Sequence, residues 1–222
     1  MNYAQLVTAI QDYTENSFNY STDPTPINTF IEQAEQRIYN SVQFPSIRKN
    51  VTGTTTSGNK YLSCPNDFLA VYSMSVETTD GQEFLLNKDV NFIRQAYPKA
   101  TDTATPKYYA LFGPSVNGTT ISNELAFILG PTPDSGYTVE LHYYYYPESI
   151  VTASTTWLGD NFDSVLLYGS LVEAYTYMKG EADIMTFYNT KYQEALALAK
   201  RLGDGMERQD AYRSGQARQA VT

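Results

Sequence analysis

The sequence has very few of the side chains on which thiol and metal chemistry depend. Its 222 residues contain one Cys, one His and one Trp. A single Cys cannot form an internal disulfide, and a single His without a nearby Cys or second His makes a poor metal site. No cofactor fingerprint occurs along the chain. We therefore expect no disulfide framework, no bound metal and no cofactor.

Positive charge and long apolar runs are also scarce. The chain carries 15 Lys and Arg against 24 Asp and Glu, a formal charge of −9. Proteins that wrap nucleic acid need clustered Lys and Arg to neutralise phosphates, so the composition argues against a protein whose bulk binds nucleic acid. The first residues show neither a basic run nor an apolar stretch. We expect no signal peptide and no membrane span, in a protein made in a cytosol.

Tyrosine, in contrast, is abundant, with 20 residues. Its ring is large and apolar, while its hydroxyl requires water or a hydrogen-bond partner. Tyr is also enriched at the contacts between proteins. The excess therefore indicates half-buried surfaces and protein interfaces more than a dry core.

Helical periodicity occurs towards both ends of the chain. Apolar residues recur at three- and four-residue spacing over residues 3–13 and 26–44, and Thr25 is expected to cap the second of these helices. The same spacing returns after Pro147, in a helix that ends at Gly180 and in a second one that ends near Leu202. From Gly203 the sequence is polar and rich in Gly, and we expect a flexible tail there.

The middle of the chain has the pattern of antiparallel strands. Short runs of Thr, Tyr and Val are broken by Gly, Pro, Asn and Asp. Residues 53–60 have the glycine spacing of a phosphate-binding loop, but Asn59 stands at the required Lys, and we expect a hairpin turn instead. One or two helical turns are expected at residues 89–94. The expected strands are 48–55, 60–63, 70–77, 83–86, 107–112, 119–121, 124–129 and 137–146.

The order of these segments predicts the fold class. The apolar stripe of each terminal helix needs a partner, and the nearest unsatisfied stripes lie at the opposite end of the chain. The prediction is therefore an α+β fold: a discontinuous helical bundle formed by both chain ends, residues 1–46 and 148–203, with an inserted antiparallel β domain, residues 47–147. Residues 204–222 form a flexible C-terminal tail in this prediction.

No group of residues indicates catalysis clearly. Cys64 is far in sequence from His142, and we expect it to be a small residue at a strand end. Asp160 and Asp163 lie at the start of an expected helix, where the helix dipole favours negative charge. Hydrolysis by such carboxylates or by Cys64 stays open as the third choice among functions, and we predict no catalytic residue.

The last expected strand carries the single His, directly followed by four Tyr. Alternation along a strand places His142, Tyr144 and Tyr146 on one face. We expect this face to form a contact between subunits, because Tyr is enriched in interfaces. Stacking of the rings on sugars is the alternative, and it would make the β domain a binding module.

The end of the chain differs in charge from the rest. From Lys200 onward there are five cations and three anions, a net charge of +2, which leaves −11 for residues 1–199. Spaced Arg residues with one Tyr form the composition of a docking peptide for an acidic or groove-like partner. A solvated chain end is the alternative interpretation.

Several segments resemble the head-to-tail adaptor proteins of tailed bacteriophages. They are Tyr-Ala-Gln-Leu-Val at residues 3–7, residues 30–39, and residues 157–162 leading into 171–175. The resemblance spans nearly the whole chain and rests on the order and character of these segments. It implies a non-enzymatic structural protein of the virion neck, made in the host cytoplasm, in which a helical bundle with a β insertion assembles as a ring, usually of twelve copies.

The resemblance also implies partners. Such a ring lies under the portal protein, extends the DNA channel and offers a platform to a tail or nozzle protein. An acidic body suits a channel through which DNA passes without specific binding. Adaptor tails commonly reach into the portal, which assigns portal contacts to Arg201, Arg208, Tyr212, Arg213 and Arg218. The alternative function is a tail-associated binding module that recognises a glycan or another protein through its Tyr-rich β surface.

Overall fold

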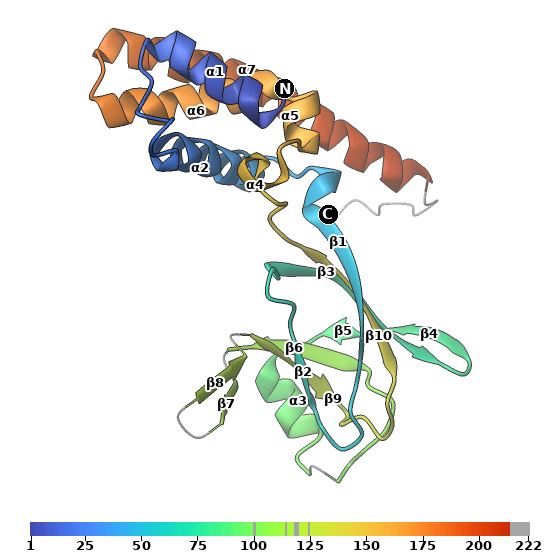
Figure 1. Cartoon of the computed structure of the whole chain (residues 1–222). Coiled ribbons are helices and arrows are strands. Elements are labelled where there is room, and N and C mark those ends of the chain that lie inside the picture. The colour runs from blue at the N-terminus through green and yellow to red at the C-terminus, as the bar shows by residue number, and fades with distance from the viewer. Residues whose placement is uncertain (100, 114, 118–119, 124, 214–222) are drawn as a thin grey trace. The chain divides into compact units, whose positions relative to one another are not determined.

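The computed structural model describes residues 1–99, 101–113, 115–117, 120–123 and 125–213. The fold is mixed α+β, with antiparallel sheets (Figure 1). The chain divides into two compact units. The helical unit comprises Met1–Ile47 and Tyr146–Thr222, and the β unit comprises Arg48–Tyr145.

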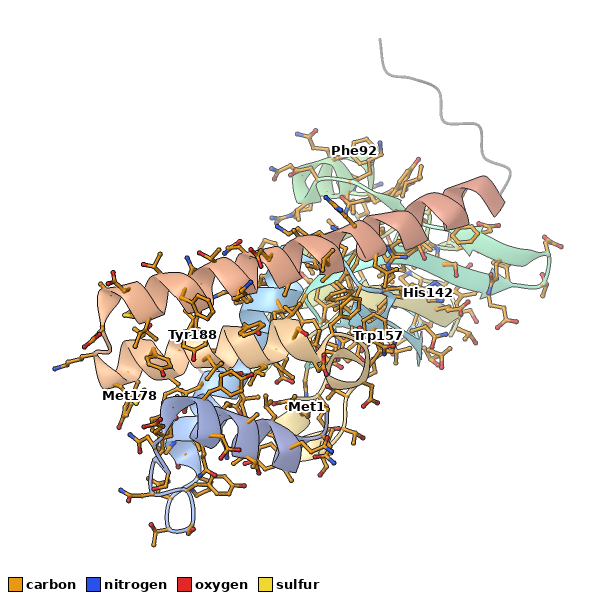
Figure 2. All side chains as sticks on the ribbon, turned by 90° about the horizontal axis from the view of Figure 1, so that it is seen from above. Met1, Phe92, His142, Trp157, Met178 and Tyr188 are labelled. Carbon is orange, nitrogen blue, oxygen red and sulfur yellow. The ribbon has the colours of Figure 1, made fainter. Side chains whose placement is uncertain are left out.

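The helical unit is organised around one central helix. Helix α6 contacts α1, α2, α5 and α7, and in Figure 2 it runs between α1 and α7. Gly169 of α6 permits this packing, since a Cβ there would lie 3.2 Å from the Cβ of Ala34 in α2 and 3.3 Å from the ring of Tyr192 in α7. The helices are α1 Tyr3–Thr14, α2 Thr25–Ser41, α4 Ile150–Ala153, α5 Trp157–Asn161, α6 Asp163–Met178 and α7 Ala182–Arg213, with a 3-10 turn at Pro45–Ile47.

The start of α2 differs by one residue from the predicted cap. Thr25 is already helical, and Pro24 occupies the capping position without a side-chain hydrogen bond. Since Pro24 has no side-chain acceptor, Asp23 takes this role: its Oδ1 accepts the Thr25 N–H at 3.0 Å. Hydrogen bonds from the side chain and the backbone of Thr25 lower the pKa of the Asp23 carboxyl.

Helix α7 is longer than the sequence predicted. It was expected to end near Leu202, but the backbone stays helical through Gly203 and Gly205 to Arg213. Each Gly costs a helix about 1 kcal/mol relative to Ala, and the good helix formers that follow, such as Glu207, offset part of this cost. The prediction that this helix ends near Leu202 is therefore wrong, and residues 214–222 lie outside the described residues.

Two four-stranded sheets make up most of the β unit. The first sheet has the order β1-β10-β3-β4 and is antiparallel throughout; the second has the order β2-β9-β6-β5, and its β5–β6 pair is parallel. Strands β7 and β8 form a separate pair. The elements are β1 Arg48–Thr54, β2 Tyr61–Ser63, β3 Ala70–Thr78, β4 Gly81–Phe84, β5 Leu86–Asn87, α3 Val90–Ala96, β6 Tyr108–Phe112, β7 Ser115–Asn117, β8 Thr120–Asn123, β9 Ala126–Gly130 and β10 Thr138–Tyr144.

A cluster of buried side chains joins the two sheets. Val76, Leu141 and Tyr143 of the first sheet pack with Phe127 and Leu129 of the second. All five are at most 5% exposed. Alternating strand residues supply this core, as the period of a pleated strand requires.

The turn predicted at residues 53–60 does not close a hairpin, because β1 and β2 belong to different sheets. The segment is held instead by residues 133–137. The Gly58 N–H donates to the Pro133 carbonyl at 2.8 Å, and the Thr55 N–H donates to the Tyr137 carbonyl at 2.9 Å. These bonds lead the chain across to the second sheet, and the positive φ of 75° at Gly58 suits the residue without a side chain.

Candidate protein interface

The alternation predicted for the last strand is present in β10. Val139, Leu141 and Tyr143 are buried, whereas His142 and Tyr144 lie partly exposed on the opposite face. The strand ends at Tyr144. The structure therefore brings His142 and Tyr144 together on one sheet face.

Tyr146 does not continue this face. It belongs to the helical unit, where its hydroxyl donates a 2.6 Å hydrogen bond to Oδ1 of Asn40. The strand period cannot extend past the end of the strand, so the prediction that Tyr146 shares a strand face with His142 is wrong.

Polar side chains form a group around His142 on the exposed face of the first sheet. Ser73 and Glu140 contact His142, and Gln82 and Asn50 contact Glu140. His142 Nδ1 lies 3.1 Å from Ser73 Oγ, and Nε2 lies 3.4 Å from Glu140 Oε1. Gln82 donates to the other oxygen of Glu140 at 2.8 Å, and Asn50 donates to Oε1 at 3.4 Å. Sequence reasoning missed this group because its members come from four strands, and only the strand register brings them together.

Ser73, His142 and Glu140 have the order of partners found in a hydrolytic triad. Acyl transfer also needs N–H donors aimed at the oxyanion, whereas Ser73 lies within β3, whose backbone pairs with β10. The imidazole is 43% exposed on a sheet face. This group is better suited to polar recognition of a partner surface than to acyl transfer.

An aromatic pair stands beside the polar group. The rings of Tyr72 and Tyr144 are 5.9 Å apart at 77°, and the Arg48 guanidinium lies 4.9 Å from the first ring and 5.9 Å from the second. Tyr72 is 56% exposed. Arg and Tyr are frequent anchors of protein interfaces. The edge-to-face geometry offers less flat surface for stacking a sugar ring than parallel rings would.

Cys64 lacks the properties of a reactive thiol. Burial raises the pKa of its thiol to about 12, whereas reactive thiols have a lowered pKa. The side chain packs against the core between the sheets. It also lines an apolar hollow of about 240 Å³ together with Val51 and Leu62.

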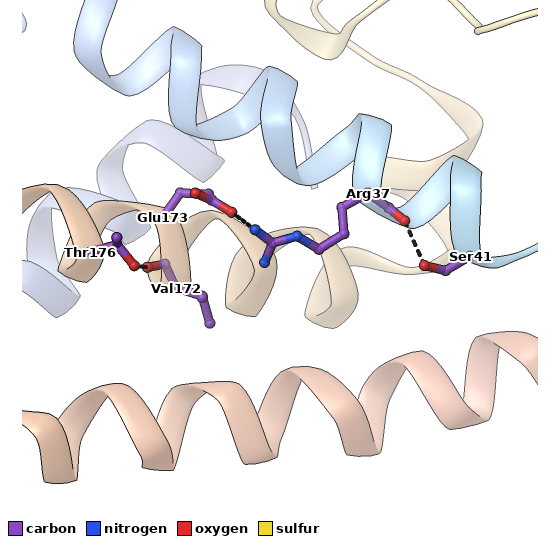
Figure 3. Close-up of polar contacts among 5 residues, drawn as sticks. All are labelled: Arg37, Ser41, Val172, Glu173 and Thr176. Atoms are coloured by element: carbon purple, nitrogen blue, oxygen red, sulfur yellow. Dashed lines mark hydrogen bonds and ion pairs between the residues drawn. The ribbon is translucent and has the colours of Figure 1, made fainter.

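The carboxylates of Asp160, Asp163 and Glu173 occupy structural positions in the helical unit. Asp160 lies in the first turn of α5 and Asp163 in the first turn of α6, so the one helix predicted there is two. Glu173 of α6 forms an ion pair with Arg37 of α2 (Figure 3). Arg37 also lies 5.9 Å from the ring centroid of Tyr192 in α7, and thus links three helices.

Glu35 is a buried carboxyl inside the helical unit. It is 3% exposed, and its Oε1 accepts the N–H of Ile150 at 3.0 Å. Burial raises the pKa of this carboxyl, and the hydrogen bonds from Ser149 and Ile150 oppose the rise. Glu35 thereby ties α2 to the start of α4, which is a structural role.

Four of the five predicted portal contacts fall on α7. Arg201 is exposed, and the backbone of Arg208, Tyr212 and Arg213 belongs to the same helix. Positions 201, 208 and 212 are seven and four residues apart, a spacing that follows one face of a helix. Arg218 lies outside the described residues.

Neither a metal-binding cluster nor a membrane-spanning helix occurs among the described residues. No group of three or more His, Cys, Asp or Glu side chains there is arranged to hold a metal ion. None of the helices described combines the length and the apolar character needed to cross a membrane.

Comparison with known proteins agrees with the resemblance seen in the sequence. A family model described as SU10 adaptor protein matches residues 1–220. A search of curated proteins found no match. The match covers nearly the whole chain and includes both units. The chain therefore belongs to the SU10 adaptor protein family, a family of structural phage adaptors that associate with other virion proteins.

Proposed function

We propose that this protein is a head-to-tail adaptor that forms a ring of twelve copies beneath the portal, in the virion neck. The ring extends the DNA channel and offers the attachment platform for a tail or nozzle protein. The observation that carries this proposal is the family match over residues 1–220, which takes in both units of the chain. The protein acts here by assembly and not as an enzyme.

The body of each subunit, in this proposal, is a helical bundle built from both chain ends. Contacts of α6 with α1 and α2 on one side of the sequence and with α7 on the other support it. The Arg37–Glu173 ion pair and the buried Glu35 each link a helix before the β unit to an element after it. A body closed by both ends holds the β unit as an insertion.

The charge of the chain suits a DNA channel. Residues 1–199 carry a net charge of −11. A channel wall of this sign repels phosphates and does not retain them, because retention requires clustered cations. DNA accordingly passes through the ring without specific binding.

The C-terminal segment is the portal-docking arm in this proposal. Residues 200–222 carry a net charge of +2, and the spacing of positions 201, 208 and 212 along α7 supports one contact face. Arg and Tyr are frequent interface anchors. The partner surface is therefore acidic or groove-like.

Truncation tests the docking arm. Deleting residues 203–222 should leave a folded protein that no longer joins heads to tails, measured as assembly yield and by pull-down with the portal protein. Deleting residues 214–222 alone distinguishes the contribution of the end of α7 to portal binding from that of the last nine residues. Alanine at Arg208, Tyr212 and Arg213 should weaken portal binding at least tenfold, whereas Arg94→Ala, a cation of the β unit, should not. An unchanged assembly yield after the longer deletion contradicts the proposed arm.

The binding-module alternative has one observation in its favour, the exposed Tyr72 beside Tyr144. A glycan-binding site there predicts binding on glycan arrays that Tyr144→Ala abolishes. The adaptor proposal predicts no glycan binding by either protein. It explains the whole chain, whereas the alternative concerns the β unit alone.

A further inference from the structure

The first sheet of the β unit has two open edges. In its strand order β1-β10-β3-β4, the described residues give β1 one neighbouring strand and β4 one neighbouring strand. Six of the seven residues of β1 are exposed. A long exposed edge is a template for pairing with another strand, and monomeric proteins usually cover or interrupt it.

The outward hydrogen-bonding groups of both edges follow from the ladder. Thr55 donates its N–H to Tyr137 across the β1–β10 pair, so the alternation of an antiparallel ladder turns the N–H and C=O of Asn50, Thr52 and Thr54 away from β10. These three residues present a regular row of outward-facing backbone groups along the edge of β1.

The edge of β4 presents the matching groups. The Leu85 N–H donates to the Met74 carbonyl at 2.9 Å, so the backbones of Gln82 and Phe84 face away from β3. Phe84 is 67% exposed, the highest value among the large apolar side chains described. In the register of the sheet, Phe84 and Thr52 are the two ends of one cross-strand row, joined through Ser75 and Glu140.

The strand directions of the two edges fit each other. The sheet has four strands and is antiparallel throughout. Strand β4 therefore runs opposite to β1, and it also runs opposite to the β1 of another copy that has the same orientation. Copies in a cyclic ring share one orientation about the axis and meet through two different surfaces. In the second sheet the β5–β6 pair is parallel, so its two edge strands run in the same direction.

The two edges also differ in net charge. Strand β1 contains Arg48 and Lys49 and no acidic residue. Residues 77–84, the end of β3 and the whole of β4, contain Glu77, Asp80 and Glu83 and no basic residue. Lys49 already pairs with Asp67 of its own chain at 2.8 Å, so this difference acts through the net charge of each edge. It makes the two edges distinct surfaces and repels a second copy of the same edge.

We propose that β4 of one copy pairs antiparallel with β1 of the next copy, so that the first sheet continues from subunit to subunit. The occupant of each edge is thus a second copy of this chain. The inference rests on the ring of the proposed function and names the surface by which its neighbours meet. Gln82 and Phe84 each offer one N–H and one C=O, so about four backbone hydrogen bonds join two subunits.

Cysteine pairs test this contact directly. In a Cys64→Ser background, Phe84→Cys is combined in turn with Asn50→Cys, Thr52→Cys or Thr54→Cys, which covers the registers that place Phe84 opposite one of these three residues. Within one chain the two edges are three strand spacings apart, roughly 14 Å, which exceeds the Cα separation of about 7 Å that a disulfide can span. Any disulfide formed is therefore between copies.

The purified variants are oxidised both alone and mixed with the portal protein, and run on non-reducing gels. At least one pair should give a ladder of dimer, trimer and higher multiples. Tyr61→Cys combined with Phe84→Cys, which uses an edge of the second sheet, should give none. The same mixture is imaged by electron microscopy to show whether rings form.

The outcomes separate this inference from the proposed function. Rings without a ladder from any of the three pairs overturn the sheet contact and leave the ring intact. If the mixture gives no rings and no ladders, both the sheet contact and the proposed ring are overturned. Ladders from the three pairs and equally from the Tyr61 control would indicate random collision and also contradict the contact.

A backbone variant gives a second measurement. Thr52→Pro removes one outward N–H of β1 and leaves the N–H groups that face β10. It should weaken assembly at least tenfold, whereas Thr52→Val, which keeps the N–H, should assemble normally. An unchanged thermal unfolding midpoint verifies that the Pro variant is folded. Normal assembly of the folded Pro variant contradicts the contact.

Discussion

The two units differ in how they use their apolar side chains. The described part of the helical unit buries more of them, with α6 enclosed by its neighbours. Among the side chains that the structure describes, the shorter β unit exposes nine large apolar ones, including Phe84, Leu86 and Tyr72, and the helical unit exposes eight. Exposed apolar groups beside open strand edges mark surfaces for contact. The comparison indicates that the helical unit has the larger buried core, and that the β unit exposes its apolar groups over a shorter stretch of chain.

Removing a core ring of the β unit should have the largest effect on stability. Phe127 is fully buried, with its ring 5.4 Å from Phe68 and 5.9 Å from Tyr109. Phe127→Ala should lower the free energy of unfolding by about 3–5 kcal/mol, because it removes apolar contacts and leaves a cavity. Urea unfolding followed by circular dichroism measures the loss.

The matched control is Phe112→Ala, which changes a Phe that is 51% exposed in β6. It should alter stability by less than about 0.5 kcal/mol. Equal losses for the two variants would contradict the assignment of the β core. If the far-ultraviolet circular dichroism of the helices persists in Phe127→Ala while the near-ultraviolet signal of the aromatic rings falls, the β unit unfolds while the helical unit stays folded.

A small addition to the helical unit should have the next largest effect. A Cβ at Gly159 would lie 2.7 Å from the Met1 carbonyl oxygen and 2.8 Å from Cδ1 of Ile150. Gly159→Ala should therefore cost about 1–3 kcal/mol through overpacking. Gly53→Ala in β1 is the control, because a Cβ there meets nothing within 4 Å. The thermal unfolding midpoints of both variants measure this difference. A loss of stability in Gly53→Ala and none in Gly159→Ala would contradict the prediction.

The buried Glu35 should give the helical unit a pH dependence. Burial raises the pKa of this carboxyl above its unfolded value, so the folded state binds the proton more tightly than the unfolded state. Its contribution is therefore most favourable below the unfolded pKa and is lost as pH rises through the folded pKa. Glu35→Gln should remove this part of the decline in unfolding midpoint between acidic and neutral pH. An identical pH profile in the variant would show that another group is responsible.

The smallest effect is expected at Asp67 in the β unit. Burial alone would raise its pKa, but hydrogen bonds from Lys49 and Tyr143 hold the pKa below the usual value. Its contribution is present above the unfolded pKa and is lost as pH falls through the folded pKa. Asp67→Asn should flatten the acid side of the stability profile slightly, since exposed ion pairs contribute little. A loss as large as that of Gly159→Ala would contradict this ranking.

Local pattern predicted much of the secondary structure, and long-range pairing could not be read from it. The apolar spacing around Ile31 and Leu171 identified helices that the structure contains, because a helix face repeats within a few residues. The glycines at 203 and 205 suggested an end for α7, but an isolated Gly only costs a helix some free energy. The pairing of β1 with β10 joins residues about ninety positions apart, and no local pattern specifies such a register.

The candidate interface shows the same limit. Alternation placed His142 and Tyr144 on one face, as the structure does. Ser73 and Gln82 lie in the same group because of the order of strands in the sheet, which the sequence pattern did not predict. The open edges of β1 and β4 likewise follow from strand order, whereas the roles of Arg208 and Tyr212 in portal binding stay predictions.

The mass of the assembly tests the adaptor account most directly. Light scattering of the purified chain, alone and mixed with its portal protein, should be combined with electron microscopy of the mixture. The account predicts closed rings of twelve copies on the portal, whether the free chain is a 24.9 kDa monomer or already a ring. A stable monomer that does not bind the portal would contradict it.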